Sequence, residues 1–252
     1  MRIVVVATWL VLVFGLVGPS SAAAHPGDLD STFGTGGKVG TPLATFGGLA
    51  IDGDGRILAG GLLGEDGAPV VARYRSDGSP DATFGVGGIA RMVADPPLGT
   101  VEAVATQADG RAIVAVDTTV VRVGLSFDAI RVLRLTADGA IDAGFDTART
   151  AIVTGGDHRT PPRLGGLSIG ADDTIDLAVF GCALGTVCPL VVEHLDRDGD
   201  VLSELEGNDA DVEINAGAAL PQPDGKIVSA ASFLSAAGDL LVQRYEPSAG
   251  CA

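Results

Sequence analysis

A Gly-x-Ser-x-Gly segment and a histidine upstream of it are the residues that could build a nucleophilic hydrolase site. Residues 166–170 place Ser168 at the centre of this pattern, and His158 is the nearest candidate base. A nucleophile elbow needs a strand before the serine, a helix after it and the histidine later in the chain. His158 comes first and no helical periodicity follows, so we predict that Ser168 is an ordinary strand residue. No catalytic residue is assigned.

Alternating aspartates are the residues that could bind a divalent cation. Asp196, Asp198 and Asp200 resemble the start of a calcium loop, but the sixth and twelfth positions hold Val201 and Gly207. Helix-flanked calcium loops need Gly and Glu at those two places. An Asp-Gly hairpin turn is therefore the favoured interpretation, with calcium binding by the three aspartates as the alternative. No other metal or cofactor is expected.

Arginines inside apolar strands recur with an aspartate eight residues later. The pairs are Arg73 with Asp81 and Arg134 with Asp142. A buried guanidinium needs a carboxylate, because an unpaired buried charge is strongly destabilising, and arginine binds carboxylates through two donors at once. The spacing predicts structural ion pairs. The alternative is that these arginines extend to solvent.

The same two positions predict a contact between the ends of the chain. In a third, weaker copy both members differ, to His194 and Leu202, as expected if they interact. Arg244 has no aspartate eight residues after it, and Asp30 has no arginine eight residues before it. We therefore predict that Arg244 pairs with Asp30.

These residues belong to a unit that recurs four times. Each copy combines short apolar runs around an Asp-Gly turn, a strand with the charged residue, and in the clearer copies an Asp-x-x-Phe-Gly return. Asp-Gly between apolar runs is a strong hairpin signal. The returns begin at Asp30, Asp81 and Asp142, at spacings of 51 and 61 residues, near the lengths of known structural repeats. Residues 112–116 are apolar on both faces, as in a sheet packed between two others.

The pattern Asp-Gly-Lys/Arg-Ile, followed by Ala-Arg-Tyr-x-x-Asp-Gly-Ser-x-Asp-x-x-Phe-Gly-x-Gly-Gly, resembles the delta-60 repeat, a bacterial propeller-like repeat. The match is strong over residues 28–88, fair over 104–145 and 219–245, and weak over 167–205. The resemblance implies a propeller-like fold and secretion. It carries over no catalytic residue and no ligand.

The predicted fold is all-β, a small β-propeller of about four four-stranded blades. The copies span roughly residues 40–88, 89–149, 150–206 and 207–252, and residues 28–39 complete the last one. Pairing of the N-terminal segment with the C-terminal blade would remove both free sheet edges and close the ring. The closed form is a monomer, or two chains that exchange termini to share an eight-bladed ring.

Residues 1–24 are predicted to be a secretory signal peptide. Arg2 precedes an apolar run of about 15 residues, shorter than the roughly 20 that span a bilayer, and small residues follow it. The chain is therefore expected outside the cell or in its envelope, and not in a membrane after cleavage. There, a disulfide between Cys182 and Cys188 would close a short hairpin, leaving Cys251 unpaired.

The chain is acidic, with a formal net charge of −16, or −17 once the leader is removed. This charge argues against nucleic acid as a partner. The sole tryptophan, Trp9, leaves with the leader, which argues against sugar binding by stacking. The predicted function is a secreted, non-catalytic scaffold or binding module for a protein or small-molecule ligand. The alternative is a secreted hydrolase or lyase with an acidic site in the central depression, using His158 or Ser168. An enzyme should gather titratable residues from different copies at one end of the ring.

Overall fold

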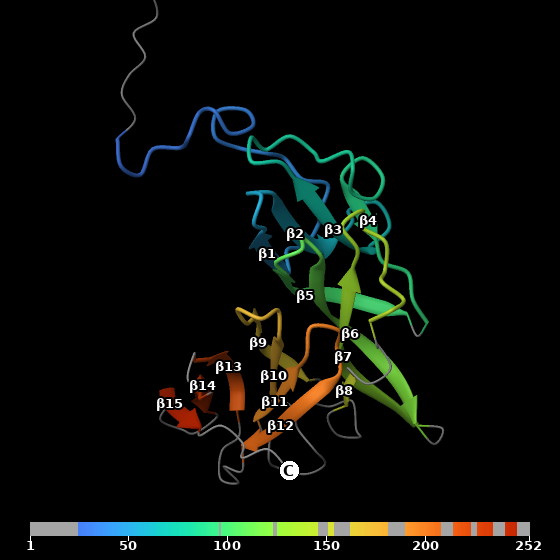
Figure 1. Ribbon diagram of the computed structural model, residues 1–252, viewed down its shortest axis with the longest axis vertical. Helices are drawn as coiled ribbons and strands as arrows, with labels where there is room; N and C mark the ends of the chain where they lie inside the picture. Colours follow the sequence, from blue (N-terminus) through green and yellow to red (C-terminus); the bar gives the residue numbers. More distant parts are fainter. Residues whose placement is uncertain are drawn as a thin grey trace, which may run out of the picture.

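The computed structural model describes residues 25–95, 97–122, 125–145, 151–153, 162–180, 190–207, 214–222, 226–233 and 240–245. The predicted leader, His158, the Cys182–Cys188 pair and Cys251 lie outside these residues, so those predictions stay untested. The described residues form strands and turns, with no helix among them (Figure 1). Accordingly, the described part of the chain holds no helix able to cross a membrane.

Four antiparallel sheets are built from consecutive strands. The first contains β1 (Gly48–Ile51), β2 (Ile57–Leu62), β3 (Pro69–Tyr74) and β4 (Ile89–Arg91). The second contains β5 (Leu98–Thr106), β6 (Ala112–Arg122), β7 (Leu125–Leu135) and β8 (Ala151–Val153). The third contains β9 (Arg163–Ile169), β10 (Ile175–Phe180), β11 (Leu190–Leu195) and β12 (Val201–Gly207). The fourth contains β13 (Ile214–Pro221), β14 (Ile227–Phe233) and β15 (Leu240–Tyr245).

Asp-Gly turns set the register within the sheets. Asp52 to Gly55 turns the chain between β1 and β2, with Ile51 opposite Ile57. Gly55 has a φ of 75°, a left-handed conformation that glycine adopts without strain. The Asx contacts of Asp52, which accepts from the main-chain N–H groups of Asp54 and Arg56 at 3.0 and 2.9 Å, hold the turn closed.

The core lies between successive sheets. Alternate residues of β6 pack in opposite directions: Ala112, Val114 and Val116 contact the first sheet, whereas Ile113 and Ala115 contact the third. Both faces of the second sheet are thus buried, which explains why residues 112–116 are apolar without alternation. A smaller cluster joins the third and fourth sheets around Phe180 and Ile227.

The first strands of the sheets, β1, β5, β9 and β13, lie beside one another along the inner side of the series. Their main chains come close. A Cβ atom at Gly47 would lie 1.6 Å from the carbonyl oxygen of Val101, so only glycine fits there. The first and second sheets therefore approach closely through main chain at this point.

The sheets form an open series, with β1–β4 at one end and β13–β15 at the other (Figure 1). The predicted closure does not occur. The N-terminal segment lies against the first sheet instead, where Gly34 N donates to Asp77 O at 2.8 Å and Val39 packs near Tyr74. These contacts use its main chain and apolar side chains far from β15. The fourth sheet accordingly has three strands within the described residues.

Candidate functional site

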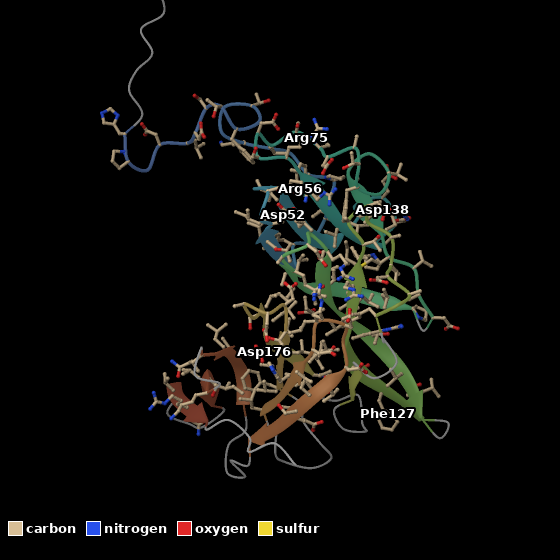
Figure 2. All side chains as sticks on the ribbon, in the orientation of Figure 1. Asp52, Arg56, Arg75, Phe127, Asp138 and Asp176 are labelled. Atoms are coloured by element: carbon tan, nitrogen blue, oxygen red, sulfur yellow. The ribbon has the colours of Figure 1, made fainter. Side chains whose placement is uncertain are left out.

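Ser168 lies within β9, and no histidine of the described residues lies beside it. The strand registers place Ser168 opposite Asp176, and Asp176 opposite His194. Oδ1 of Asp176, labelled in Figure 2, is 2.7 Å from Nδ1 of His194. Serine and histidine are thus two strand spacings apart, roughly 10 Å. Because the aspartate stands between them, His194 cannot take a proton from Ser168.

The carboxylate beside His194 was not expected from the sequence, because in the other copies the aspartate lies eight residues after the arginine. It comes from the neighbouring strand instead. Asp176 faces His194 across β10 and β11, at the place where Ile113 faces Arg134 in the second sheet. An aspartate at a repeat position that is otherwise apolar was the signal that could have revealed the pair.

Arg73 is buried and joins the first sheet to the second. Its Nε donates to Oδ2 of Asp81 at 2.8 Å, and its Nη2 donates to Oγ1 of Thr83 at 3.2 Å. Its Nη1 donates to the carbonyl of Ala137, in a turn of the second sheet, at 2.8 Å. The guanidinium also lies 4.4 Å from the centre of the Phe84 ring. Such a contact adds a cation–π attraction.

Arg134 repeats this arrangement between the second and third sheets. Nε donates to Oδ2 of Asp142 at 2.7 Å, and Nη1 donates to the carbonyl of Arg197 at 2.8 Å. Nη1 also contacts Oδ1 of Asp198 at 3.0 Å, and the Phe145 ring centre is 5.0 Å away. Each arginine therefore pairs with the aspartate eight residues later and reaches forward to the next sheet. The contact with the phenylalanine ring and the hydrogen bond to a carbonyl of the next sheet were not expected from the sequence.

The aspartates of these pairs, Asp81 and Asp142, have a structural role. Burial alone would raise the pKa of Asp81, but hydrogen bonds from Thr83 and the charge of Arg73 outweigh it and lower that pKa. The pKa of Asp142 is lowered in the same way, against burial, by the Gly144 N–H and by Arg134. Carboxyl groups with lowered pKa values stay ionised at neutral pH and are poor proton donors.

The alternating aspartates form a turn. Oδ1 of Asp196 accepts from the main-chain N–H groups of Asp198 and Asp200, both at 2.9 Å. The Asp198 carboxylate contacts Arg134. Within the described ranges no cluster of three or more His, Cys, Asp or Glu residues could hold a metal ion.

Arg244 and Asp30 are both exposed. Arg244 lies in β15 of the fourth sheet, whereas Asp30 belongs to the segment that contacts the first sheet. No ion pair joins these two described side chains. Oδ1 of Asp30 accepts from N and Oγ1 of Thr32 instead, at 2.9 and 2.6 Å, and these bonds lower the Asp30 pKa. The predicted pairing is therefore not made within the chain as the structure has it.

A cavity of about 610 Å³ opens between the second and third sheets. Its charged lining residues are Glu102, Asp117, Asp128 and Arg163. Asp117 and Asp128 come from the β6–β7 hairpin, whose strands are 11 residues long, and Phe127 lies near the end of this hairpin (Figure 2). The sequence analysis missed all four residues because they fall outside the repeated markers.

Burial raises the pKa values of two acids of this cavity, Asp117 and Glu102. Burial, and then the charge of Asp128, raise the pKa of Asp117, although main-chain N–H groups oppose the shift. Burial, and then the charge of Asp117, raise the pKa of Glu102 against the effect of Arg163. Oδ1 of Asp117 is buried and makes no hydrogen bond of ordinary geometry with the described residues. Asp117 thus lines the cavity, and one of its carboxylate oxygens is buried without a hydrogen bond.

Comparison with known proteins supports the propeller-like architecture. Residues 53–84 and 107–145 match the family described as "Domain of unknown function (DUF5122) beta-propeller". The search of curated proteins gave no match. Both matched segments contain an Asp-Gly turn and an Arg–Asp pair.

Solved structures of low sequence identity resemble this chain to different degrees. The subtype N10 neuraminidase-like protein of A/little yellow-shouldered bat/Guatemala is 12% identical, with a TM-score of 0.50, over 83% of this chain and 59% of its own. A protein from Dyadobacter fermentans is 13% identical, with a TM-score of 0.46, over 79% of this chain and 59% of its own. The endo-arabinase from Bacteroides thetaiotaomicron is 13% identical, with a TM-score of 0.36, over 75% of this chain and 69% of its own.

The chain thus spans 59% of the length of the first two of these structures. Likeness at such identity concerns the fold alone, and only the first reaches a TM-score of 0.50. Together, the two matched segments and the antiparallel sheets identify this chain as one built from propeller-like β repeats.

Proposed function

We propose that the protein is an exported, non-catalytic binding module of the delta-60 type. In this proposal the repeated sheets form a rigid frame, and the cavity between the second and third sheets holds a small ligand with a cationic or donor-rich group. One observation carries the proposal: Asp117 lines the cavity, and its Oδ1 is buried without a hydrogen bond within the described residues. A buried acceptor without a partner is destabilising, and a ligand that donates to it would remove that penalty.

The charge and size of the cavity indicate the ligand class. Three acidic residues and one arginine line the cavity, so an amine fits better than an anion. The volume of about 610 Å³ lies inside the range of roughly 300–1,000 Å³ typical of small-molecule sites. A primary amine would supply both the positive charge and up to three donors.

The distribution of titratable groups favours binding over catalysis. Glu102, Asp117 and Asp128 all come from the second sheet, and the third contributes only Arg163. The other buried charged pairs, at Arg73 and Arg134, hold the sheets together. An active site would be expected to combine acids from different repeats.

A hydrolase is the second candidate, because of the raised pKa values of Glu102 and Asp117. A carboxyl group with a raised pKa can act as a general acid near neutral pH. Hydrolysis of a nitrophenyl glycoside or ester by the purified protein, lost in Glu102→Gln, would support this candidate and contradict the binding module.

Isothermal titration with cadaverine, glucosamine and other primary amines tests the proposed site. We expect at least one amine to bind, with an affinity reduced tenfold or more in Asp117→Asn. Asp54→Asn is the control, because Asp54 is an exposed aspartate of the first sheet with a side chain 75% accessible. No binding by any amine, or equal loss in both variants, would contradict the proposal.

A further inference from the structure

The connection between the first two sheets has a second part beside the Arg73 contacts. Gly85, at the end of the Asp-x-x-Phe-Gly return, donates its N–H to the carbonyl of Asp138 in the next turn at 2.7 Å. The ring of Phe84 covers Gly139 in the same turn, where an added Cβ would lie 3.1 Å from the ring. A complete junction thus comprises an arginine, the return that follows it and the turn of the next sheet.

The N-terminal segment forms the same junction with the first sheet, except for the arginine. Gly34 N donates to the carbonyl of Asp77 at 2.8 Å, as Gly85 does to that of Asp138. The ring of Phe33 covers Gly78, again 3.1 Å from an added Cβ. The return at residues 30–34 therefore sits on the first sheet as though a preceding sheet carried it.

The carboxylate of Asp30 is held by the same hydrogen bonds as that of Asp81, the acceptor of Arg73. Its Oδ1 accepts from N and Oγ1 of Thr32 at 2.9 and 2.6 Å. Oδ1 of Asp81 accepts from N and Oγ1 of Thr83 at 3.1 and 2.7 Å in the complete junction, leaving Oδ2 for Arg73. Asp30 is exposed, and so is Ser76, whose carbonyl corresponds to the Ala137 acceptor.

The matching arginine lies at the other end of the series. Arg244 in β15 pairs in register with Val228, as Arg73 pairs with Leu58. Its side chain is exposed. Arg244 thus occupies the repeat position from which Arg73 reaches forward to the following sheet.

The sheet faces at the two ends are apolar and open. Leu49 and Ile51 on the outer face of the first sheet are 58% and 64% exposed, beside a groove of about 650 Å³. Leu220 and Val242 on the outer face of the fourth sheet are 60% and 62% exposed. By register, the face with Val228 corresponds to the face with Leu58, which the first sheet buries against the second. The two ends therefore carry the two halves of an internal junction.

We propose that Asp30, Phe33 and the carbonyl of Ser76 form a receptor for a guanidinium group, and that its occupant is Arg244 of a second copy of this chain. The fourth sheet of one copy then packs on the first sheet of the next, and Val242 covers the apolar groove. A second copy is the occupant because the two halves lie at opposite ends of one chain (Figure 1). Such a head-to-tail contact closes into a ring of copies or extends as a filament.

Native mass spectrometry and sedimentation of the purified protein over a range of concentrations test this assembly. We expect masses of two or more chains, and a dissociation constant raised at least tenfold in Asp30→Asn. Asp28→Asn is the matched control, because it removes an exposed negative charge two residues away and should leave the assembly intact.

Charge reversal separates contact between copies from contact within a chain. Asp30→Arg and Arg244→Asp should each be monomeric alone, and an equimolar mixture should regain the assembly, because every junction in it pairs opposite charges. Single-chain masses for the unaltered protein at all concentrations, an assembly that survives Asp30→Asn, or a mixture that stays monomeric would overturn the proposal. Circular dichroism should be unchanged throughout, since both side chains are exposed.

Discussion

At the scale of single residues, the fold depends on a few buried charges with complete sets of partners. Arg73 uses all three of its nitrogens, on a carboxylate, a hydroxyl and a carbonyl. Such saturation offsets the desolvation of the guanidinium, which an aspartate alone would not. The eight-residue spacing was sufficient to pair Arg73 with Asp81. It could not reveal the forward contact with Ala137, because that contact depends on how one sheet lies against the next.

Glu193 is a buried acid that, unlike Arg73, has an oxygen without a hydrogen-bond partner in the described residues. Burial, and then the charge of Glu204 opposite it on β12, raise its pKa from 4.5 to about 7. Between these values the native state keeps a proton that the unfolded chain has released. The free energy of unfolding from this group is therefore greatest below pH 4.5 and falls as the pH rises to about 7.

Glu193→Gln should remove this fall and leave the protein more stable at pH 8 by up to about 3 kcal/mol. Urea denaturation of both proteins between pH 4.5 and 8 measures the difference. Glu204→Gln is the control and should reduce the fall without abolishing it, since burial is the larger cause. Parallel stability curves for the unaltered protein and Glu193→Gln would show that Glu193 ionises normally.

At the scale of elements, the hairpins and returns were the most predictable features. Asp-Gly turns between apolar runs fix strand positions locally, so the strands around Gly55, Gly110 and Gly139 follow from the sequence. The long β6–β7 hairpin and its acids were not predicted, because they depart from the repeat. The course of residues 28–39 was assigned to the wrong sheet, since their pattern specifies a return but not which sheet receives it.

Substitution of Gly139 measures how much of the stability of a junction depends on close packing in the turn. The φ of Gly139 is 89°, and an added Cβ would lie 2.9 Å from the main-chain nitrogen of Gly85 and 3.1 Å from the Phe84 ring. Gly139→Ala should therefore destabilise the fold by about 2–4 kcal/mol, from left-handed strain plus displacement of the ring. Gly67, with a φ of 68° and open space around it, is the control.

Gly67→Ala should destabilise by only about 1–2 kcal/mol, from strain alone. Chemical denaturation of both variants gives the two values. Equal destabilisation would mean that the ring adjusts freely and that the junction is loosely packed.

At the scale of the whole molecule, the three junctions differ in strength. The first two have an arginine connector and extensive apolar clusters, whereas the third has His194 with Asp176 and a smaller cluster within the described residues. The fourth sheet is therefore expected to open at lower free energy than the other three.

Hydrogen exchange followed by mass spectrometry should show the amides of β13–β15 exchanging before those of β2, β6 and β10. His194→Arg is informative here, because an arginine beside Asp176 should slow exchange in the fourth sheet. Uniform protection across all four sheets would contradict this order.

Arg73 and Arg134 each contact the sheet that follows in the chain and not the one before it, so the series of sheets has a polarity. Each arginine binds a carbonyl in the turn of the sheet that follows it. An inserted or deleted repeat would therefore leave the neighbouring contacts intact. The length of the array is thus not encoded in any one junction, and duplication within a gene could lengthen it without redesigning the contacts.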